Sequence, residues 1–229
     1  MSSYGANAAF YKLPDDSVND IQPIITIGEA GYVVALHPAV PIKSIRELIA
    51  YAKANPGKLN FGSSGTGSLG HLSVELFKLA GKVDLTHIPY KSYGQALTDL
   101  ISGEIELLFG TLVGIIPHAK SGRVRVIGVT TAKRSGVPPD LPTVGETVAG
   151  YEAVSWFGLW GPKGLPKDIV TRWNKEVEKV LLTNEMKSRM ARSGVEAAGG
   201  SPAQFLNAIR RDVEKWKRVV KEAKITVEG

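Results

Sequence analysis

Short apolar runs alternate along the chain with amphipathic segments, and turn-forming residues separate the two kinds of segment. The apolar runs predict strands at Ile24–Ile27, Tyr32–Leu36, Leu59–Phe61, Val83–Ile88, Ile105–Phe109, Val124–Thr130 and Val154–Trp160, and the first two are rich in β-branched residues. The amphipathic segments have helical spacing and begin near Ser44, Ser68, Ser92, Ile115, Pro166, Asn184 and Ser201. Strand–helix alternation with short connections predicts parallel strands joined by right-handed crossovers.

Several predicted helix ends have recognisable cap residues. Ser44 precedes Glu47 by three positions, so we expect the Ser44 hydroxyl to accept the Glu47 amide and the Glu47 carboxylate to reach back. Ser92 and Gln95 have the same spacing. Gly81 follows the next predicted helix, and we expect it to adopt the left-handed conformation that ends many helices.

The balance of strands and helices changes along the chain, which predicts two domains. Residues 39–151 hold the regular alternation and should form one doubly wound α/β domain. The segment after residue 161 is mainly helical and has no sheet of its own to cover, so we expect it to pack on the early strands. This pairing predicts a second, discontinuous domain of residues 1–38 and 152–229.

Composition and charge exclude several classes of protein. Of the 229 residues, 43% are hydrophobic and 22% are charged, which is typical of a globular chain. No apolar run approaches the ~20 residues of a membrane helix, and no basic-then-apolar leader follows Met1. The net charge of +6 comes from Lys and Arg interspersed with acids, so we do not expect nucleic-acid binding. The chain has no cysteine, which excludes disulfides and thiolate chemistry.

Residues 62–68, Gly-Ser-Ser-Gly-Thr-Gly-Ser, carry the most informative chemistry in the chain. This loop follows a predicted strand and opens a predicted helix, so its amides and hydroxyls should gather at a helix N-terminus. Such an end has unpaired donors and partial positive charge, which suits a carboxylate or a phosphate. In a doubly wound sheet it also lies at the carboxyl ends of the strands, where ligands bind. A flexible turn with a serine cap is the alternative interpretation.

Three nucleotide-binding or catalytic motifs compete for the same loop. Residues 65–70 match the GxGxxG dinucleotide fingerprint, but the next strand ends at His87–Lys91 without the acid that would hold a ribose. A Walker loop needs Lys and then Ser or Thr after its last glycine, and Ser68-Leu69 stands there instead. No serine in the loop has the Gly-x-Ser-x-Gly spacing of a hydrolase elbow. A nucleotide-dependent enzyme that uses Gly62–Ser68 therefore stays only as the alternative function.

Neutral hydrogen-bond donors follow the other predicted strands as well. Tyr90 follows the next strand, Gly110 and Thr111 follow the one after it, and Thr130 follows a fourth. The four histidines have no metal-ligand spacing, and we expect no acid to pair with them. An edge with donors but without a nucleophile, a base or a metal predicts binding rather than catalysis, so we expect no enzymatic activity, no metal and no cofactor.

A set of short motifs also occurs in a fixed order along the chain. The motifs are Ala54–Leu59, Phe61–Leu72, Pro89–Leu97, Thr130–Arg134, Leu141–Val144, Val154–Gly158, Gly161-Pro162 and the helix containing Trp216. Together, and not singly, they resemble the Bug (TctC-type) extracytoplasmic solute receptors, from about Asn7 to Ile225.

The resemblance implies a type II periplasmic-binding-protein fold, in which two α/β lobes close on a ligand. It also implies that a small carboxylate is delivered in the periplasm to a tripartite tricarboxylate transporter, or is sensed there. By position, the residues that would grip one carboxylate are Ser63, Ser64, Thr66, Gly67 and Ser68, and those that would line the cleft are Tyr90, Gly110 and Thr111. Family members often have an acid or an amide at the position of Gly110, so this glycine favours plain carboxylates over amine-bearing ligands.

The first part of the family pattern has no counterpart in this chain. Family members begin with a strand, a glycine-rich loop and a helix that provide the first lobe's carboxylate grip, and the match starts beyond them. We therefore expect the first lobe to be N-terminally truncated, with exposed strand edges that favour a homodimer. A remnant that no longer binds, serving as an interaction module, is a further alternative.

Overall fold

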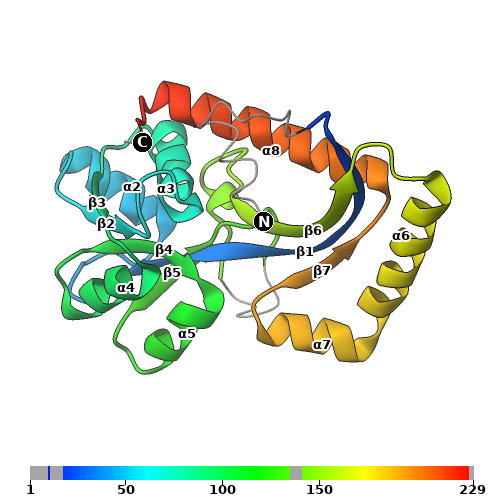
Figure 1. Ribbon diagram of the computed structural model, residues 1–229. Helices are drawn as coiled ribbons and strands as arrows, with labels where there is room; N and C mark the ends of the chain where they lie inside the picture. Colours follow the sequence, from blue (N-terminus) through cyan, green and yellow to red (C-terminus); the bar gives the residue numbers. More distant parts are fainter. Residues whose placement is uncertain (1–9, 11–17, 135–140, 227–229) are drawn as a thin grey trace. The chain divides into compact units, whose positions relative to one another are not determined.

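The computed structural model describes residue 10, residues 18–134 and residues 141–226, so Asn7, where the resemblance begins, lies outside the described residues. Contacts divide the chain into two compact units (Figure 1). Unit 1 contains the residues up to Ala30 and Ser155–Lys221, and unit 2 contains Gly31–Val154 and the residues from Glu222. The first boundary lies earlier than residue 38, where the sequence pattern places it, and strand β1 explains the difference.

Strand β1 (Ile21–Leu36) is a single strand of 16 residues that belongs to both units. The sequence pattern predicts two short strands here, separated at residues 28–31. In the structure, a Cβ on Gly28 would lie 2.6 Å from Met190 Cε, and one on Gly31 would lie 2.4 Å from Thr131 Cγ2. The prediction of two strands is therefore wrong, because these glycines allow close packing inside one strand instead of interrupting it.

Unit 2 is built on a sheet of mixed direction with the strand order β3-β2-β4-β1-β5. Its other strands are β2 (Asn60–Ser63), β3 (Thr86–Pro89), β4 (Leu107–Thr111) and β5 (Arg125–Val129). β2 pairs in parallel with β3 and β4, as predicted. The second half of β1 lies between β4 and β5 and runs antiparallel to both, so β4 and β5 are parallel to each other, as predicted. The prediction that Tyr32–Leu36 belongs to the other domain is wrong, because these residues form an inner strand of this sheet. These hydrogen bonds place Gly31–Leu36 in unit 2.

Helices cover both faces of this sheet. α2 (Ile45–Ala54) and α3 (Leu69–Gly81) lie on one face, and α4 (Tyr93–Ser102) and α5 (Leu112–Lys120) lie on the other (Figure 1). On the first face, the rings of Phe77 and Phe109 pack with centroids 5.8 Å apart. On the second face, Leu100 and Ile115 join a buried cluster with Leu108. Helices on both faces confirm the predicted α/β class. A short 3-10 helix, η1 (Val144–Glu146), follows β5.

Two helix ends differ in detail from the predicted caps. The Ser44 hydroxyl accepts the Glu47 amide at 3.1 Å, but the Glu47 carboxylate accepts from the Lys43 N–H at 2.7 Å and does not reach back to Ser44. At the end of α3, the left-handed residue is Lys82, with a φ of 51°, and Gly81 is still helical. The prediction for Gly81 is wrong by one position because this buried glycine belongs to the last turn of the helix.

Unit 1 joins the first half of β1 to two further strands. They are β6 (Val154–Pro162) and β7 (Glu196–Gly199), and its helices are α6 (Lys167–Leu182), α7 (Asn184–Arg192) and α8 (Pro202–Glu222). β7 pairs antiparallel with β1. The sequence pattern predicts no strand in this mainly helical C-terminal segment, and β7 corrects that prediction. The pattern conceals β7 because its sequence, Glu-Ala-Ala-Gly, has no β-branched or aromatic residue.

Candidate functional site

The carboxyl ends of three neighbouring strands meet at one edge of the unit 2 sheet. β2 ends at Ser63, β3 ends just before Tyr90, and β4 ends at Thr111. Because β2 is parallel to both neighbours, the structure brings the predicted residues of all three strands to this edge. α3 and α5 begin here as well, so their unpaired first-turn amides face the same edge.

Ser63 is buried, and its hydroxyl is fully used by neighbouring groups. Its Oγ donates to the Gly65 carbonyl at 3.0 Å and accepts from the Gly65 N–H at 3.2 Å. The same Oγ lies 2.7 Å from His87 Nε2, which must then act as the donor. A hydroxyl has one donor and two acceptor positions, so this residue holds the loop to β3 and has no position left for a ligand.

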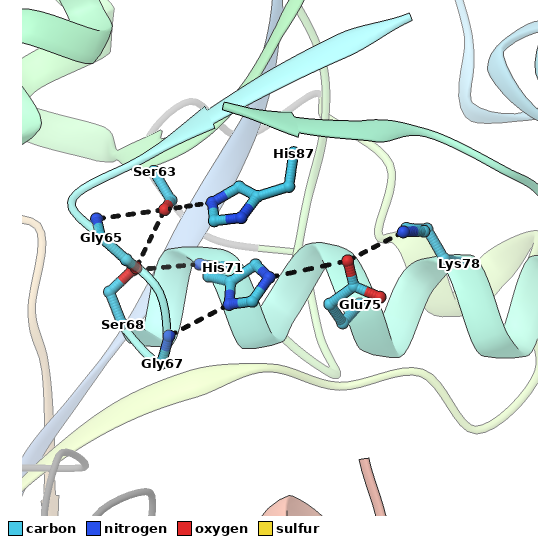
Figure 2. A network of polar contacts seen from close by, with 8 residues as sticks. All are labelled: Ser63, Gly65, Gly67, Ser68, His71, Glu75, Lys78 and His87. Carbon is cyan, nitrogen blue, oxygen red and sulfur yellow. Dashed lines mark hydrogen bonds and ion pairs between the residues drawn. The ribbon is translucent and has the colours of Figure 1, made fainter. Parts of the chain in front are cut away.

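His71 and His87 form a stacked pair beneath the loop (Figure 2). Their ring centroids lie 3.9 Å apart with an interplanar angle of 13°, and Phe61 stacks on His87 at 4.8 Å. His71 Nδ1 accepts the Gly67 N–H at 3.1 Å, so the His71 ring is neutral and carries its proton on Nε2. Burial, and then the neighbouring His71, lower the pKa of His87 to about 4. Both rings are therefore neutral near pH 7.

An ion pair on α3 completes this network (Figure 2). Lys78 Nζ lies 2.9 Å from Glu75 Oε1, and His71 Nε2 lies 3.7 Å from the same oxygen. The expectation that no acid pairs with a histidine is therefore wrong, because one turn of α3 brings Glu75 beside His71. Burial acts to raise the pKa of Glu75, but the contacts with His71 and Lys78 outweigh it and lower that pKa below its ordinary value. The ionised carboxylate orients His71, which in turn holds the Gly67 amide.

The outer surface of the loop carries hydroxyls that the buried network does not use. Ser64 and Thr66 are exposed. Gly65 and Gly67 have φ angles of 113° and 80°, which favour glycine and turn the backbone around the two side chains. Because the Gly67 N–H is bonded to His71, Gly67 contributes the shape of the loop rather than a donor.

The N-terminus of α3 supplies further donors beside these hydroxyls. Ser68 is the N-cap, and its Oγ accepts the His71 N–H at 3.3 Å, which leaves the Ser68 hydroxyl proton for an outside acceptor. The amides of Leu69 and Gly70, the first two of the helix, have no intrahelical acceptor. All of these donors are neutral, and together they suit an anion such as a carboxylate.

Tyr90 lies at the edge but is oriented toward α4. A Cβ on Gly62 would lie 3.3 Å from Tyr90 Cε2, so the ring packs over this glycine. Burial, and then the neighbouring Asp99, raise the pKa of Tyr90 to about 12, which places its hydroxyl beside Asp99. The side chain lines an open hollow of about 720 Å³ between the end of β3 and α4. Its link to the loop is through the backbone, since the Tyr90 N–H bonds to the Ser63 carbonyl at 3.0 Å.

The end of β4 contains a residue that the sequence analysis did not single out, Tyr93. Gly110 is buried, and a Cβ there would lie 2.6 Å from Tyr93 Oη. Thr111 is exposed and caps α5 by accepting the Gly114 N–H at 3.3 Å. The available signal for Tyr93 was Gly110 itself, because a glycine at a strand end leaves space that a larger neighbour can fill.

Thr130, at the end of β5, is used entirely within the fold. Its side chain is fully buried. Its Oγ1 accepts the Tyr32 N–H at 2.7 Å and donates to the Ala153 carbonyl at 2.6 Å. This threonine therefore joins β1 to the segment before β6 and does not present its hydroxyl at the edge.

In residues 18–134 and 141–226, no three His, Asp or Glu side chains gather so that they could hold a metal ion. Among the helices of these same segments, none combines the length and the hydropathy of a membrane span.

Comparison with known proteins finds a family match over nearly the whole chain. The model of the family described as "Tripartite tricarboxylate transporter family receptor" matches residues 1–225. The protein BugT of Bordetella pertussis is 29% identical over 213 residues, which cover 92% of this chain and 65% of BugT. The chain thus spans slightly less than two thirds of the length of this relative.

Solved structures resemble the chain over a similar extent. Rpa4515 of R. palustris, determined with adipate, superposes with a TM-score of 0.82 at 34% identity. The match covers 98% of this chain and 76% of the Rpa4515 chain. MatC (Rpa3494) from Rhodopseudomonas palustris, with bound malate, gives a TM-score of 0.75 at 26% identity over 95% of this chain and 76% of its own. This likeness confirms the predicted periplasmic-binding-protein fold class.

Proposed function

Because the chain belongs to the tripartite tricarboxylate transporter receptor family, we propose that it is a solute receptor that binds a small organic carboxylate. The family is one of receptors rather than of enzymes. The observation that carries the proposal is the set of neutral donors that Ser64–Ser68 and the first turn of α3 present on a loop held by buried contacts. A helix N-terminus with unpaired amides and hydroxyls is an anion site of a common kind.

We divide the predicted grip into two roles. Ser64, Thr66 and Ser68 contact the carboxylate through their hydroxyls, together with the first-turn amides of α3. Ser63 and Gly67 position the loop, since the hydroxyl of one and the amide of the other are already bonded within the protein. This division predicts different effects for substitutions at adjacent serines.

The proposed ligand is a plain di- or tricarboxylate. Support comes from two similar structures, one determined with adipate and the other with bound malate, which are dicarboxylates without an amine. In this chain Gly110 has no side chain that could pair with an ammonium group. The nucleotide-dependent enzyme that the GxGxxG spacing suggested is not favoured, because the family match is to receptors.

The same family membership supports a periplasmic location and delivery of the ligand to the membrane subunits of a tripartite tricarboxylate transporter. We also propose a homodimer. Its support is a row of large apolar side chains on one face of α6: Ile169, Trp173 and Val180 are 39%, 54% and 48% exposed. Exposed apolar residues gathered on one helix are typical of an interaction surface.

Thermal denaturation in the presence of candidate ligands tests the proposed function. Adipate, malate and citrate should raise the melting temperature, whereas NAD and ATP should not, since a ligand at 100 times its Kd stabilises the folded state by about 2.7 kcal/mol. Stabilisation by NAD or ATP alone would support the enzyme instead. No shift with any of these probes would contradict the receptor function and favour a remnant that does not bind.

A matched pair of helix caps tests the site itself. Ser68 caps α3 at the candidate site. Ser44 caps α2, which follows the C-terminal end of β1, at the edge of the sheet opposite the candidate site. Ser68→Ala and Ser44→Ala should lose similar stability, about 1 kcal/mol each, because each removes one N-cap bond. Only Ser68→Ala should weaken binding of adipate or malate in calorimetry, and equal affinities for the two variants would refute the assignment.

A further inference from the structure

The hydroxyl of Tyr93 lies in a space that two glycines leave open. A Cβ on Gly110 would lie 2.6 Å from Tyr93 Oη, and a Cβ on Gly114 would lie 2.8 Å from the same atom. Real side-chain atoms do not approach one another this closely, so any other residue at either position would displace the phenol. Gly110 is the next-to-last residue of β4 and Gly114 lies in the first turn of α5, so two separate elements accommodate one hydroxyl.

This hydroxyl is buried, and no group among the residues that the structure describes accepts its proton. Burial raises the pKa of Tyr93 above its ordinary value, and hydrogen bonds from the side chain and backbone of Thr111 to the phenol oxygen act in the opposite direction. The phenol therefore keeps its proton near pH 7 and is a hydrogen-bond donor. A buried donor without a partner is rare in proteins and calls for a reason, such as a group that binds there.

The position of Tyr93 connects it with the proposed site. Its hydroxyl lies at the carboxyl end of β4, beside the exposed Thr111 and the partly exposed Gly114. Phe109, the residue before Gly110, lies beside α3. A Cβ on Gly70, in the first turn of that helix, would lie 3.6 Å from the Phe109 carbonyl oxygen. The phenol and the donors of α3 therefore lie at the same edge of the sheet.

We propose that Tyr93 is a specificity-determining residue whose hydroxyl donates a hydrogen bond to an oxygen of the bound carboxylate ligand. The inference rests on the proposed function. Because Gly110 has no side chain that could contact the ligand, the Tyr93 hydroxyl is the group that contacts it at this position. A neutral phenol that donates selects an oxygen acceptor, whereas an acidic side chain at residue 110 would select an ammonium group. The hydroxyl thus directs the site toward acids without an amine.

Replacing Tyr93 by Phe tests the inference, because it removes only the hydroxyl. Isothermal titration of the full chain with adipate, malate and citrate should show about 10-fold weaker binding by Tyr93→Phe of each probe that the wild type binds. The melting temperature without ligand should stay equal or rise, since no described residue accepts the proton of the lost hydroxyl. Tyr51→Phe is the matched control, because it removes a phenol oxygen from α2 and should change neither quantity.

The possible outcomes distinguish failure of the Tyr93 role from failure of the proposed receptor function. If the wild type binds none of the probes, the proposed function fails and this inference fails with it. If the wild type binds and Tyr93→Phe binds equally well, the receptor function stands and the role of Tyr93 is overturned. A fall in melting temperature with unchanged affinity would likewise overturn it, because Tyr93 would then only hold Thr111 in place.

Discussion

The rings of His71 and His87 stack with their centroids 3.9 Å apart, and each ring holds a different part of the same loop. His87 donates to the Ser63 hydroxyl, and His71 accepts the Gly67 amide. A proton on His71 Nδ1 would remove that acceptor, and two stacked cations would repel each other. The shape of the loop therefore depends on both imidazoles staying neutral.

Acid should destabilise the protein through His87. Its pKa in the folded state is about 4, below the ordinary value of 6.5, so its contribution to stability is complete above pH 6.5 and is lost as the pH falls from 6.5 to 4. Because solvent partly screens the ring, we expect a loss of about 1–2 kcal/mol, less than the full pKa difference implies.

Denaturant unfolding between pH 7 and pH 4 measures this effect. His87→Gln keeps a donor for Ser63 but cannot titrate, so its stability should fall less steeply with pH than that of the wild type. His37→Gln, which removes a histidine from the segment after β1, is the control and should follow the wild type. Parallel curves for His87→Gln and the wild type would show that His87 does not titrate in this range.

Adjacent serines should respond differently to truncation. Ser63→Ala leaves His87 Nε2 and the Gly65 amide without their partner, so we expect the free energy of unfolding to fall by about 1–3 kcal/mol. Ser64→Ala removes an exposed hydroxyl, so stability should stay within about 0.5 kcal/mol while affinity for the carboxylate falls. Urea denaturation and calorimetry on both variants measure the two effects, and a destabilised Ser64→Ala would contradict the division of roles.

Ligand affinity should depend little on salt. The proposed grip consists of hydroxyls and helix amides, so binding does not rest on long-range attraction between full charges. Between 50 and 500 mM NaCl we expect the Kd for adipate or malate to change by less than about threefold. A steep increase in Kd with salt would show instead that a lysine or arginine side chain provides the main contact.

The apolar row on α6 should control self-association. Trp173→Glu places a charge in the middle of this row and should shift a dimer toward the monomer, which light scattering after size exclusion detects. Lys175→Glu is the control, because this exposed lysine lies on the same helix but outside the row. A wild type that stays monomeric at high concentration would contradict the homodimer.

The candidate loop could be predicted from sequence because its signals are local. A short apolar strand, a glycine-serine turn and an amphipathic helix follow one another within residues 59–81, and Ser68 is the cap that the pattern indicates. The network beneath the loop could not be predicted in the same way. The pairing of His87 with His71 depends on the register of β3 beside β2, which no helical or strand period reports.

Long-range packing accounts for the other differences. The glycines of β1 look like interruptions until Met190 and Thr131 are seen against them. β7, Glu-Ala-Ala-Gly, has no residue that favours a strand, and it is a strand only because it pairs with β1. Tyr93 is the first residue of a helix by its spacing, and its hydroxyl matters only because Gly110 makes room for it.

The continuity of β1 has a practical consequence for dividing this protein. A fragment that starts at residue 39 would lack Gly31–Leu36, and β4 and β5 would each lose the strand hydrogen-bonded between them. Two open edges of this kind invite pairing with other chains. A synthetic peptide of residues 31–36 should therefore insert into such a fragment, which makes this strand a starting point for split-protein complementation.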